Sequence, residues 1–194
     1  NPHGMLMGLP GIKIAFPSSA ADFKGLLIES IREPNPVVFF ADLMLLGKKG
    51  DVPEGAYSIE FGKADVKREG TDVTVVAIGS TVPQALEVAD QLAETGVSVE
   101  VIDPRTLVPF DWDAVAKSVS KTGRLVAVDP NRETCGAASE IITQAVERCW
   151  SQLKAQPQRV TWPNVPMPYS PPLEKAVVSD LDDIRRAIEL TLKS

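Results

Sequence analysis

The sequence predicts an α/β protein with a doubly wound, mainly parallel sheet, preceded by a partial βαβ unit of a second α/β domain. Apolar runs of strand length alternate with amphipathic runs of helix length along most of the chain. Some strand-like runs, such as VVFFA at 37–41, are apolar throughout, as in strands buried on both faces. A polar, glycine-bearing stretch at 47–55 (GKKGDVPEG) indicates a linker, so we expect one domain at 1–46 and another at 56–194.

The first unit is expected to contain a strand, a helix and a second strand. Residues 12–16 (IKIAF) form the first strand, and Ser19 follows as a helix N-cap with Asp22 three residues on. Gly25 in mid-helix indicates close backbone packing. Two parallel strands and one helix cannot bury both faces of a sheet, so this unit should be an orphaned edge that completes something larger. Its exposed edges and the run VVFFADLMLL predict self-association.

The remaining chain carries the alternation that predicts right-handed crossovers between parallel strands. Its expected elements are two strands within 62–79 around a turn at 69–72, a helix from about 81 to 96 that begins with a Thr81 and Gln84 capping box, a strand at 97–102, a helix at 111–121 capped by Asp111, a strand at 124–129, a helix at 136–153, a strand at 158–162 and a helix at 179–192.

Composition and charge exclude several classes of function. The net charge is −6 without a basic cluster, so a phosphate backbone would be repelled and nucleic-acid binding is not expected. No apolar run approaches the roughly 20 residues that cross a bilayer, so we expect no membrane association and place the protein in the cytoplasm, or in the mitochondrial matrix if a transit segment has been removed. Cys135 and Cys149 lie about 20 Å apart along a predicted helix, too far for a disulfide, and with His3 they make no zinc ligand set.

Two strand ends could bind ligands. Gly79 at a strand-to-helix turn and Asp103 at the end of the next strand suggest a dinucleotide site, and hence a nicotinamide-dependent oxidoreductase, but residues 80–82 carry side chains where the fingerprint needs glycine. A plain connection is the simpler interpretation. Asp103 and Arg105 also stand where an open sheet binds ligands, although an ion pair that pins the loop explains them equally.

Three further stretches have a functional and a structural interpretation. NRETCGAASE (131–140) could offer helix N-terminal amides to an anion, or be capped by Thr134. PNVPMPYSPP (163–172) could be a polyproline ligand, or a rigid loop whose Met167 and Tyr169 pack against a neighbour. His3 lies in what looks like a frayed start, and no base and nucleophile pair or phosphate loop completes a catalytic apparatus.

Several stretches together resemble one family. LPGIKIAFPSSAADFKGLL, IREPNPVVFF, GKADVKREGTDVTVVAIG, VEVIDPRTLVPFD and VPMPYSPPLEKAV are similar, in order and spacing, to the C-terminal half of the β subunit of the decarboxylating component of 2-oxo acid dehydrogenase complexes. That family includes the pyruvate, branched-chain and acetoin enzymes and belongs to the transketolase superfamily. The element PxPYxxxLE, here PMPYSPPLE, separates it from transketolase itself.

The resemblance implies which parts of the enzyme this chain holds. Residues 9–46 correspond to the last βαβ piece of the domain that binds the pyrimidine of thiamine diphosphate, and residues 56–194 to the complete transketolase-like C-terminal domain. The glutamate that activates the cofactor lies in the missing half, and the diphosphate and Mg²⁺ site belongs to the α subunit. We therefore expect no catalytic or cofactor-binding residue in this chain. Gly8 stands where the family keeps a histidine, and Cys135 and Ala137 where it usually has glycines.

One metal site is implied by the same resemblance. In relatives, main-chain carbonyls in the turn after the first helix help to hold a monovalent cation, usually K⁺. The matching positions are Ser30, Ile31, Glu33 and Asn35.

The resulting hypothesis is a fragment or truncated homologue of the β subunit. It would provide association with a second copy or with the α subunit, and docking onto the lipoyl acyltransferase core, while the intact enzyme decarboxylates a 2-oxo acid and passes the acyl group to lipoamide. The alternative is a stand-alone interaction module derived from a truncated transketolase-like gene.

Overall fold

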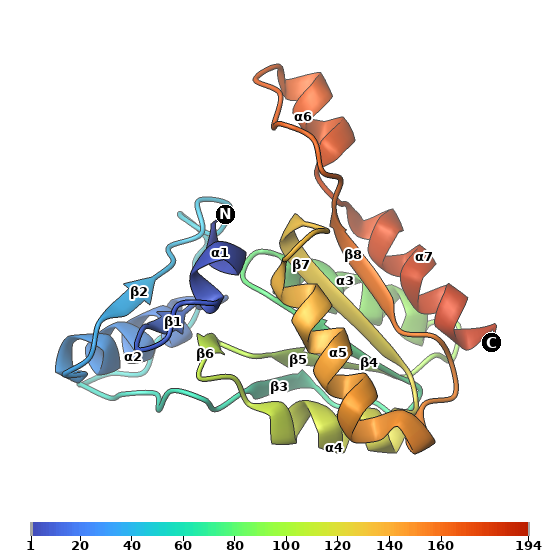
Figure 1. The fold of residues 1–194 in the computed structure, drawn as a ribbon, viewed down its shortest axis with the longest axis horizontal. Coiled ribbons are helices and arrows are strands. Elements are labelled where there is room, and N and C mark those ends of the chain that lie inside the picture. Colours follow the sequence, from blue (N-terminus) through green and yellow to red (C-terminus); the bar gives the residue numbers. More distant parts are fainter. Residues whose placement is uncertain (1, 194) are drawn as a thin grey trace.

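The computed structural model describes residues 2–193 and contains two sheets that lie side by side (Figure 1). The elements in chain order are α1 (His3–Met7), β1 (Lys13–Ala15), α2 (Ala20–Arg32), β2 (Val37–Phe39), β3 (Asp65–Arg68), β4 (Val73–Ala77), α3 (Thr81–Ala93), β5 (Val99–Asp103), β6 (Thr106–Val108), α4 (Trp112–Thr122), β7 (Leu125–Arg132), α5 (Ala137–Cys149), a 3-10 turn (Trp150–Gln152), β8 (Gln158–Trp162), α6 (Pro171–Val177) and α7 (Leu181–Leu192).

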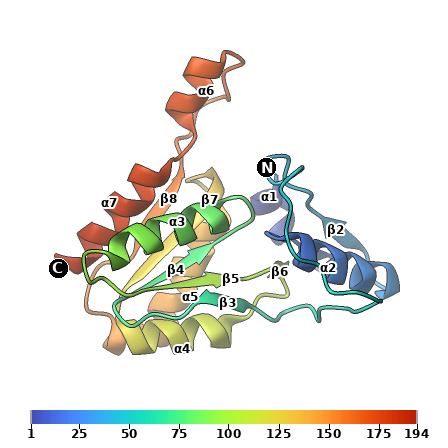
Figure 2. The same cartoon turned by 180° about the vertical axis from the view of Figure 1, so that it is seen from behind.

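The larger sheet has the doubly wound form that the sequence predicts. Its strand order is β3-β5-β4-β7-β8, and every pair is parallel except β3 with β5. Helices α4 and α5 cover one face and α3 and α7 the other, as Figure 2 shows from behind. The three middle strands are almost wholly buried because both faces are covered.

The strands on either side of the turn at 69–72 do not pair with each other. β3 lies antiparallel to β5, and β5 separates it from β4. β3 has the sequence DVKR and is only half-buried, whereas β4 (VTVVA) is buried throughout. A charged strand belongs at the margin of a sheet and an apolar one at its centre, which is consistent with this order.

The smaller sheet corrects the expectation of an orphaned edge. Its order is β2-β1-β6, so β1 is the middle strand, parallel to β2 and antiparallel to β6. β6 comes from the larger unit and was missed in the sequence because three residues followed by Pro109 look like loop. The outermost strand on the N-terminal side is β2. The two units therefore share a sheet.

The hydrophobic core is continuous across the two units. Ile14 and Phe16 from the β1 segment are fully buried in the same cluster as Ile78, Ile102 and Leu107. The larger sheet has its second core on the opposite face, where α3 and α7 pack. The N-terminal unit is thus packed onto the larger one as part of a common interior.

Local sequence signals gave mixed results. The Ser19 hydroxyl accepts a hydrogen bond from the Asp22 amide, and Asp111 caps α4 by accepting from the Ala114 amide, as predicted. The prediction of a capping box formed by Thr81 and Gln84 is wrong, because the Thr81 hydroxyl forms hydrogen bonds with the backbone of Ile78 instead. Both cysteines are free, Cys149 buried and Cys135 exposed near the start of α5, in agreement with the prediction.

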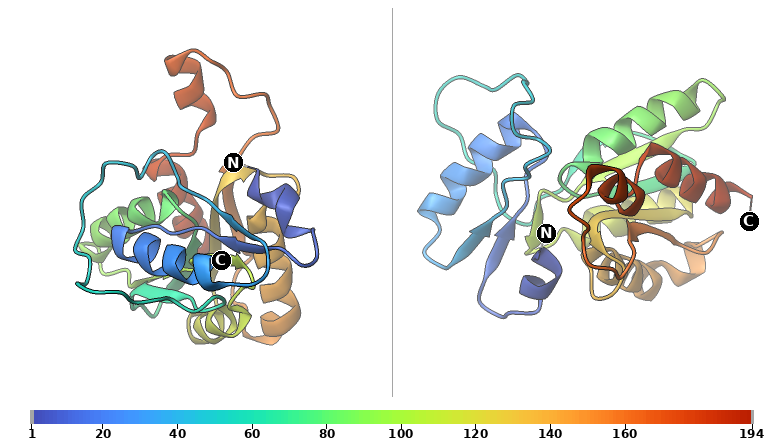
Figure 3. Two further views of the ribbon diagram at one scale, coloured as in Figure 1. Left: turned by 90° about the vertical axis from the view of Figure 1, so that its left-hand side faces the viewer. Right: turned by 90° about the horizontal axis from the view of Figure 1, so that it is seen from above.

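The proline segment is the part that departs furthest from expectation. Residues 163–178, here called the arm, run from β8 into the short helix α6 and project away from the body (Figures 1 and 3). The Tyr169 side chain is completely exposed, so the prediction that it packs against a neighbour is wrong within this chain. Helix α6, which begins at Pro171, was not predicted because its flanking prolines suggested a loop.

Candidate functional site

The carboxyl ends of the parallel strands meet the N-terminal unit, and this contact region is here called the seam. It gathers the segments after β1, β2, β4, β5 and β7, where open α/β sheets place their ligands. The Phe16 amide donates to the Arg105 carbonyl at 2.8 Å, which joins the end of β1 to the loop after β5. The seam is therefore the natural place to look for chemistry.

Asp103 is a fully buried acid at the seam. One of its oxygens, Oδ2, accepts a hydrogen bond from the Ser18 hydroxyl, while Oδ1 accepts from the Arg105 amide at 2.9 Å. Lys67 Nζ lies 3.9 Å from Oδ2. Burial raises the pKa of Asp103 to about 6, against the opposing effects of Ser18 and Lys67. This carboxyl therefore titrates close to neutral pH while it is held by groups from both units.

Asp22 and Lys67 form the ionised part of the same cluster. Lys67 Nζ donates to Asp22 Oδ2 at 2.7 Å and lies 2.7 Å from Asp65 Oδ2. Burial alone would raise the pKa of Asp22, but hydrogen bonds from Lys67 and Ser19 outweigh it and hold the pKa below its usual value. Burial likewise opposes the charge of Lys67, yet its bonds to Asp22 and Asp65 raise its pKa. The ion pair fastens α2 to β3.

The predicted ion pair between Asp103 and Arg105 is not formed. The Arg105 guanidinium donates to the Lys63 carbonyl at 2.8 Å and lies 3.4 Å from Asp22 Oδ1. Arg105 has φ +58, a left-handed conformation that turns the backbone so that its amide, rather than its side chain, reaches Asp103. The loop is pinned as expected, but by a backbone hydrogen bond.

His3 contradicts the expected frayed start. It lies in helix α1, is fully buried, and its Nε2 is 2.7 Å from Asp129 Oδ1. The rings of Phe16 and Phe40 pack around it, with centroids at 5.3 and 5.8 Å. Its Nδ1 has no hydrogen-bond partner among the described residues. Sequence inspection missed this pair because His3 and Asp129 are 126 positions apart.

The Asp129 carboxylate also lies at the start of α5, where the sequence suggested that residues 131–140 could bind an anion. Its Oδ2 accepts the Ala138 amide at 3.1 Å, in the first turn of α5. Thr134 does not cap the helix, and its hydroxyl accepts instead from Asn164. A buried carboxylate of the chain itself thus bonds the start of α5, in the position that an anion would take.

The start of α3 is closed in a similar way. The Asp42 carboxylate accepts the Ser80 amide at 3.0 Å. A Cβ on Gly79 would lie 2.8 Å from the Phe16 ring, so the glycine is needed for packing between the two units. Neither Gly79 nor Asp103 is therefore open to a dinucleotide, and the observations give no support to the nicotinamide interpretation.

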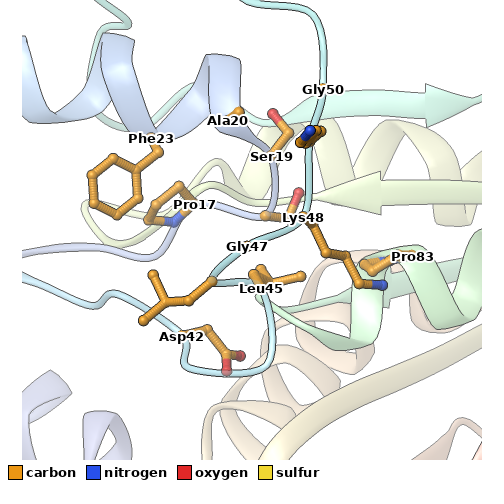
Figure 4. A pocket seen from close by; sticks show the side chains of 13 residues that line it. Pro17, Ser19, Ala20, Phe23, Asp42, Leu45, Gly47, Lys48, Gly50 and Pro83 are labelled. Carbon is orange, nitrogen blue, oxygen red and sulfur yellow. The ribbon is translucent and has the colours of Figure 1, made fainter.

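An open pocket of about 390 Å³ lies beside the cluster (Figure 4). Pro17, Ser19 and Phe23 form one side, and Asp42 and Lys48 belong to the loop that faces them. Among residues 2–193, no group of three or more histidine, cysteine or acidic side chains is arranged to hold a metal ion. Nor does any helix in that range have the length and apolarity to cross a membrane.

The positions predicted for a cation lie away from this pocket, at the other end of α2. Ser30 and Ile31 are in the last turn of that helix, Glu33 follows it, and Asn35 is in the turn before β2. The Glu33 carboxylate accepts from Lys13 at 2.6 Å and from the Asn35 side chain at 2.6 Å. These contacts order the turn, and the cation site stays a prediction.

Comparison with known proteins agrees with the fold described above. Residues 62–184 match the family model of the transketolase C-terminal domain. The chain belongs to this family.

Its relatives include β subunits of the kind suggested by the sequence. It is 43% identical over 185 residues to acetoin:2,6-dichlorophenolindophenol oxidoreductase subunit beta of Cupriavidus necator. The aligned region covers 95% of this chain and 55% of the relative. It is 42% identical to the pyruvate dehydrogenase E1 component subunit beta of Bacillus subtilis, covering 87% of this chain and 52% of the relative. The family resemblance is confirmed, and the chain spans about half the length of the curated relatives it matches.

A solved structure shares the fold of nearly the whole chain. It is a split gene transketolase, an inactive beta4 tetramer, with a TM-score of 0.73 and 23% sequence identity, over 98% of this chain and 60% of that one. The similarity shows the transketolase-like architecture of both units.

Proposed function

We propose that this chain serves as the C-terminal part of a 2-oxo acid dehydrogenase β subunit, where it provides subunit association and docking rather than chemistry. Support comes from the relatives, which are β subunits of acetoin and pyruvate enzymes. We expect its partners to be a second copy or the α subunit, together with the lipoyl acyltransferase core. We place it in the cytoplasm, or in the mitochondrial matrix if a transit segment is removed.

The observation that carries this proposal is how the polar groups of the seam are used. Asp103, Asp42 and Asp129 each accept a backbone amide of the loops or helices that follow the strands. Asp22 pairs with Lys67, and His3 with Asp129. These carboxylates and the histidine could face a substrate in an active site, but here they bind other groups of the same chain. This use is consistent with a scaffold.

The residues present do not fit thiamine diphosphate. Free amides at a helix N-terminus commonly bind a diphosphate, and an amide at the start of α3 and one at the start of α5 are bonded by Asp42 and Asp129. In the proposed complex the cofactor and Mg²⁺ would be held by the other parts of the enzyme. Calorimetric titration of the chain with thiamine diphosphate and Mg²⁺ should show no binding, and micromolar affinity would contradict the proposal.

Association can be measured directly. The chain, mixed with the α subunit of the Bacillus subtilis pyruvate dehydrogenase E1 component, should sediment with it, and an excess of that enzyme's own β subunit should displace it because both use the same surface. If the two proteins do not co-sediment at concentrations up to about 100 μM of each, the result would count against the proposal, because a dissociation constant above that value is too weak for a stable subunit contact.

The domain boundaries belong to the same proposal. Residues 1–46 would correspond to the last piece of the pyrimidine-binding domain, 47–55 to the linker and 56–194 to the C-terminal domain. The carbonyls of Ser30, Ile31, Glu33 and Asn35 would hold a monovalent cation, K⁺ by preference. Replacing K⁺ by a bulky organic cation at constant ionic strength should then lower the melting temperature, and an unchanged value would remove the cation from the proposal.

A stand-alone interaction module is the second candidate. It is favoured by Gly8, where the family has a histidine, and by Ala137, where relatives have glycine. If the chain fails to pair with the α subunit but binds other proteins through the same surface, this candidate would replace the first.

A further inference from the structure

We propose that the pocket of Figure 4 binds a small monocarboxylate whose body is wholly apolar, as in a medium-chain fatty acid. The pocket lies where the loops after β1 and β2 meet the start of α3, at the carboxyl ends of strands, where open α/β sheets bind their ligands. The inference goes beyond the proposed function and does not depend on it.

The walls of the pocket are mainly apolar. Its volume of about 390 Å³ lies within the range of small-molecule sites, about 300–1,000 Å³. The Leu46 side chain lines the pocket and is nevertheless 59% exposed, so apolar area there is left in contact with water. A ligand with an apolar body would cover this area, and the burial of apolar surface favours binding. The apolar side chains of the lining come from all three segments: Pro17, Ala20, Phe23, Leu45, Leu46 and Pro83.

The charged side chains of the pocket leave one positive charge. Two lysines, Lys48 and Lys49, line it together with one acid, Asp42, and within residues 2–193 the lining holds no other charged side chain. Neither lysine ammonium has an ion-pair or hydrogen-bond partner among the described residues, whereas both oxygens of Asp42 accept backbone amides. Figure 4 shows the Lys48 side chain extending along the pocket towards Pro83.

This local charge selects a monoanion. A single carboxylate balances the lining, while a neutral molecule gains nothing from the lysines and a dianion brings an excess of negative charge beside Asp42. The chain as a whole carries a net charge of −6, so the two lysines form a local exception that attracts an anion to this position.

The uncharged polar side chains of the pocket are already in use. The Ser18 hydroxyl donates to Asp103, and the Ser19 hydroxyl donates to Asp22. An oxo or hydroxyl group on the body of the ligand would therefore lose its hydrogen bonds to water without a side-chain replacement, which is unfavourable. The carboxylate is thus the only polar group that the site accommodates, and this separates the ligand from the 2-oxo acids of the proposed enzyme.

The test is a titration of the whole chain with octanoate, followed through the backbone amide chemical shifts in NMR spectra. The amides of residues 18–20 and 45–50 should shift and saturate with a dissociation constant below about 1 mM. Octanol has the body without the charge and should bind about fivefold more weakly. Acetate has the charge without the body and should bind at least about tenfold more weakly. Added salt should weaken the binding of octanoate and not that of octanol, because both lysines are exposed.

Two lysine pairs test the charge. Lys48→Gln with Lys49→Gln should raise the dissociation constant for octanoate about fivefold, since each exposed charge pair contributes little. Lys117→Gln with Lys175→Gln removes two exposed lysines outside the pocket and gives the same net charge. This matched control should bind octanoate as the wild type does.

Two leucines of one loop test the apolar wall. Leu46→Ser should raise the dissociation constant for octanoate at least about twofold, because Leu46 lines the pocket. Leu43→Ser, which changes a 79% exposed side chain outside the lining, is the control and should not alter it. Without ligand, all these variants should keep the melting temperature of the wild type, because the side chains that they change are exposed.

Four results would each overturn the inference: no saturable shift up to about 10 mM octanoate, equal affinity for octanol, an unchanged constant in the Lys48 and Lys49 variant, or shifts confined to residues outside the pocket. The outcome is separable from that of the proposed function. This assay contains no α subunit, and the co-sedimentation assay contains no octanoate, so failure in one leaves the other standing.

Discussion

At the scale of single residues, the seam is organised by carboxylates that accept backbone amides. Asp42, Asp103 and Asp129 come from three different segments, yet each bonds an amide that follows a strand end. For Asp42 and Asp129 the bonded amide lies at a helix start, where amides carry partial positive charge, so a carboxylate is an effective acceptor there. The same bonds that order the loops remove those amides from use by a ligand.

The titration of Asp103 gives the first prediction. Its pKa is raised from 3.8 to about 6, so ionisation of Asp103 destabilises the native state relative to the unfolded state. The free energy of unfolding should therefore fall as pH rises from about 4 to about 6, by roughly 3 kcal/mol at about 1.4 kcal/mol per pKa unit. Below pH 4 the lowered pKa of Asp22 acts in the opposite direction, and stability is lost as pH falls.

Urea unfolding of Asp103→Asn between pH 4.5 and 8 checks this. A neutral amide cannot ionise, so the variant should lose the slope between pH 4.5 and 6. Asp113→Asn, at an exposed position of α4, is the control and should keep it. An unchanged slope in Asp103→Asn would show that other groups set the pH dependence.

Two glycines of the N-terminal segment give a matched pair of substitutions. A Cβ on Gly4 would lie 2.6 Å from the Cys135 carbonyl oxygen, whereas one on Gly8 would meet nothing within 4 Å. Gly4→Ala should cost about 1–3 kcal/mol, and Gly8→Ala should stay within about 0.5 kcal/mol. Gly8→His, which introduces the family histidine, should also fold, as thermal unfolding of the three variants will show. Equal losses for Gly4→Ala and Gly8→Ala would mean that α1 does not pack against 131–136.

At the scale of elements, three short segments hold the two units together. α1 contributes His3 to the interior, β6 adds a strand to the small sheet, and the loop before α2 supplies Ser18 to Asp103. Each is five residues or shorter, too short for independent stability. Their stability therefore comes from the contacts across the seam.

The link between α1 and β7, made by His3 and Asp129, can be measured by a double-mutant cycle. His3→Ala removes the hydrogen-bond partner of the buried oxygen Asp129 Oδ1, which typically costs about 1–3 kcal/mol. Combined with Asp129→Ala, the loss should be smaller than the sum of the two single losses by about 1–3 kcal/mol. Urea unfolding provides the values. Combination of His3→Ala with the remote Asp113→Ala should be additive, and additivity in the His3 and Asp129 cycle would disprove the coupling.

At the scale of the whole molecule, the two sheets should unfold as one. They share the core around Ile14, Phe16 and Ile102 and the strand β6. Native-state hydrogen exchange should therefore give the amides of β1 the same opening free energy as those of β4. The amides of α6 should exchange fast in the monomer, because that helix has no buried residue. A β1 that opens well before β4 would show that the N-terminal unit is an independent module.

Much of the architecture could be predicted because it depends on neighbours in the chain. The caps at Ser19 and Asp111 and the apolar strands follow from residues within a few positions of each other. β6 and the partner of β3 could not, because strand pairing joins distant segments and TLV carries too little signal. The arm escaped prediction for a different reason: its prolines suit an ordered loop, and nothing local says whether that loop packs.

The sequence by itself determined the class of fold, the order of most of its elements and the family, since hydrophobic periodicity, turn residues and motif spacing are written along the chain. The tertiary structure alone decided what the polar side chains do. It brought His3 to Asp129 and Ser18 to Asp103 across 126 and 85 positions, and in that apolar interior a polar group without a hydrogen bond is costly. Which partner it meets depends on how the sheets lie against each other, a property of packing that no stretch of sequence contains.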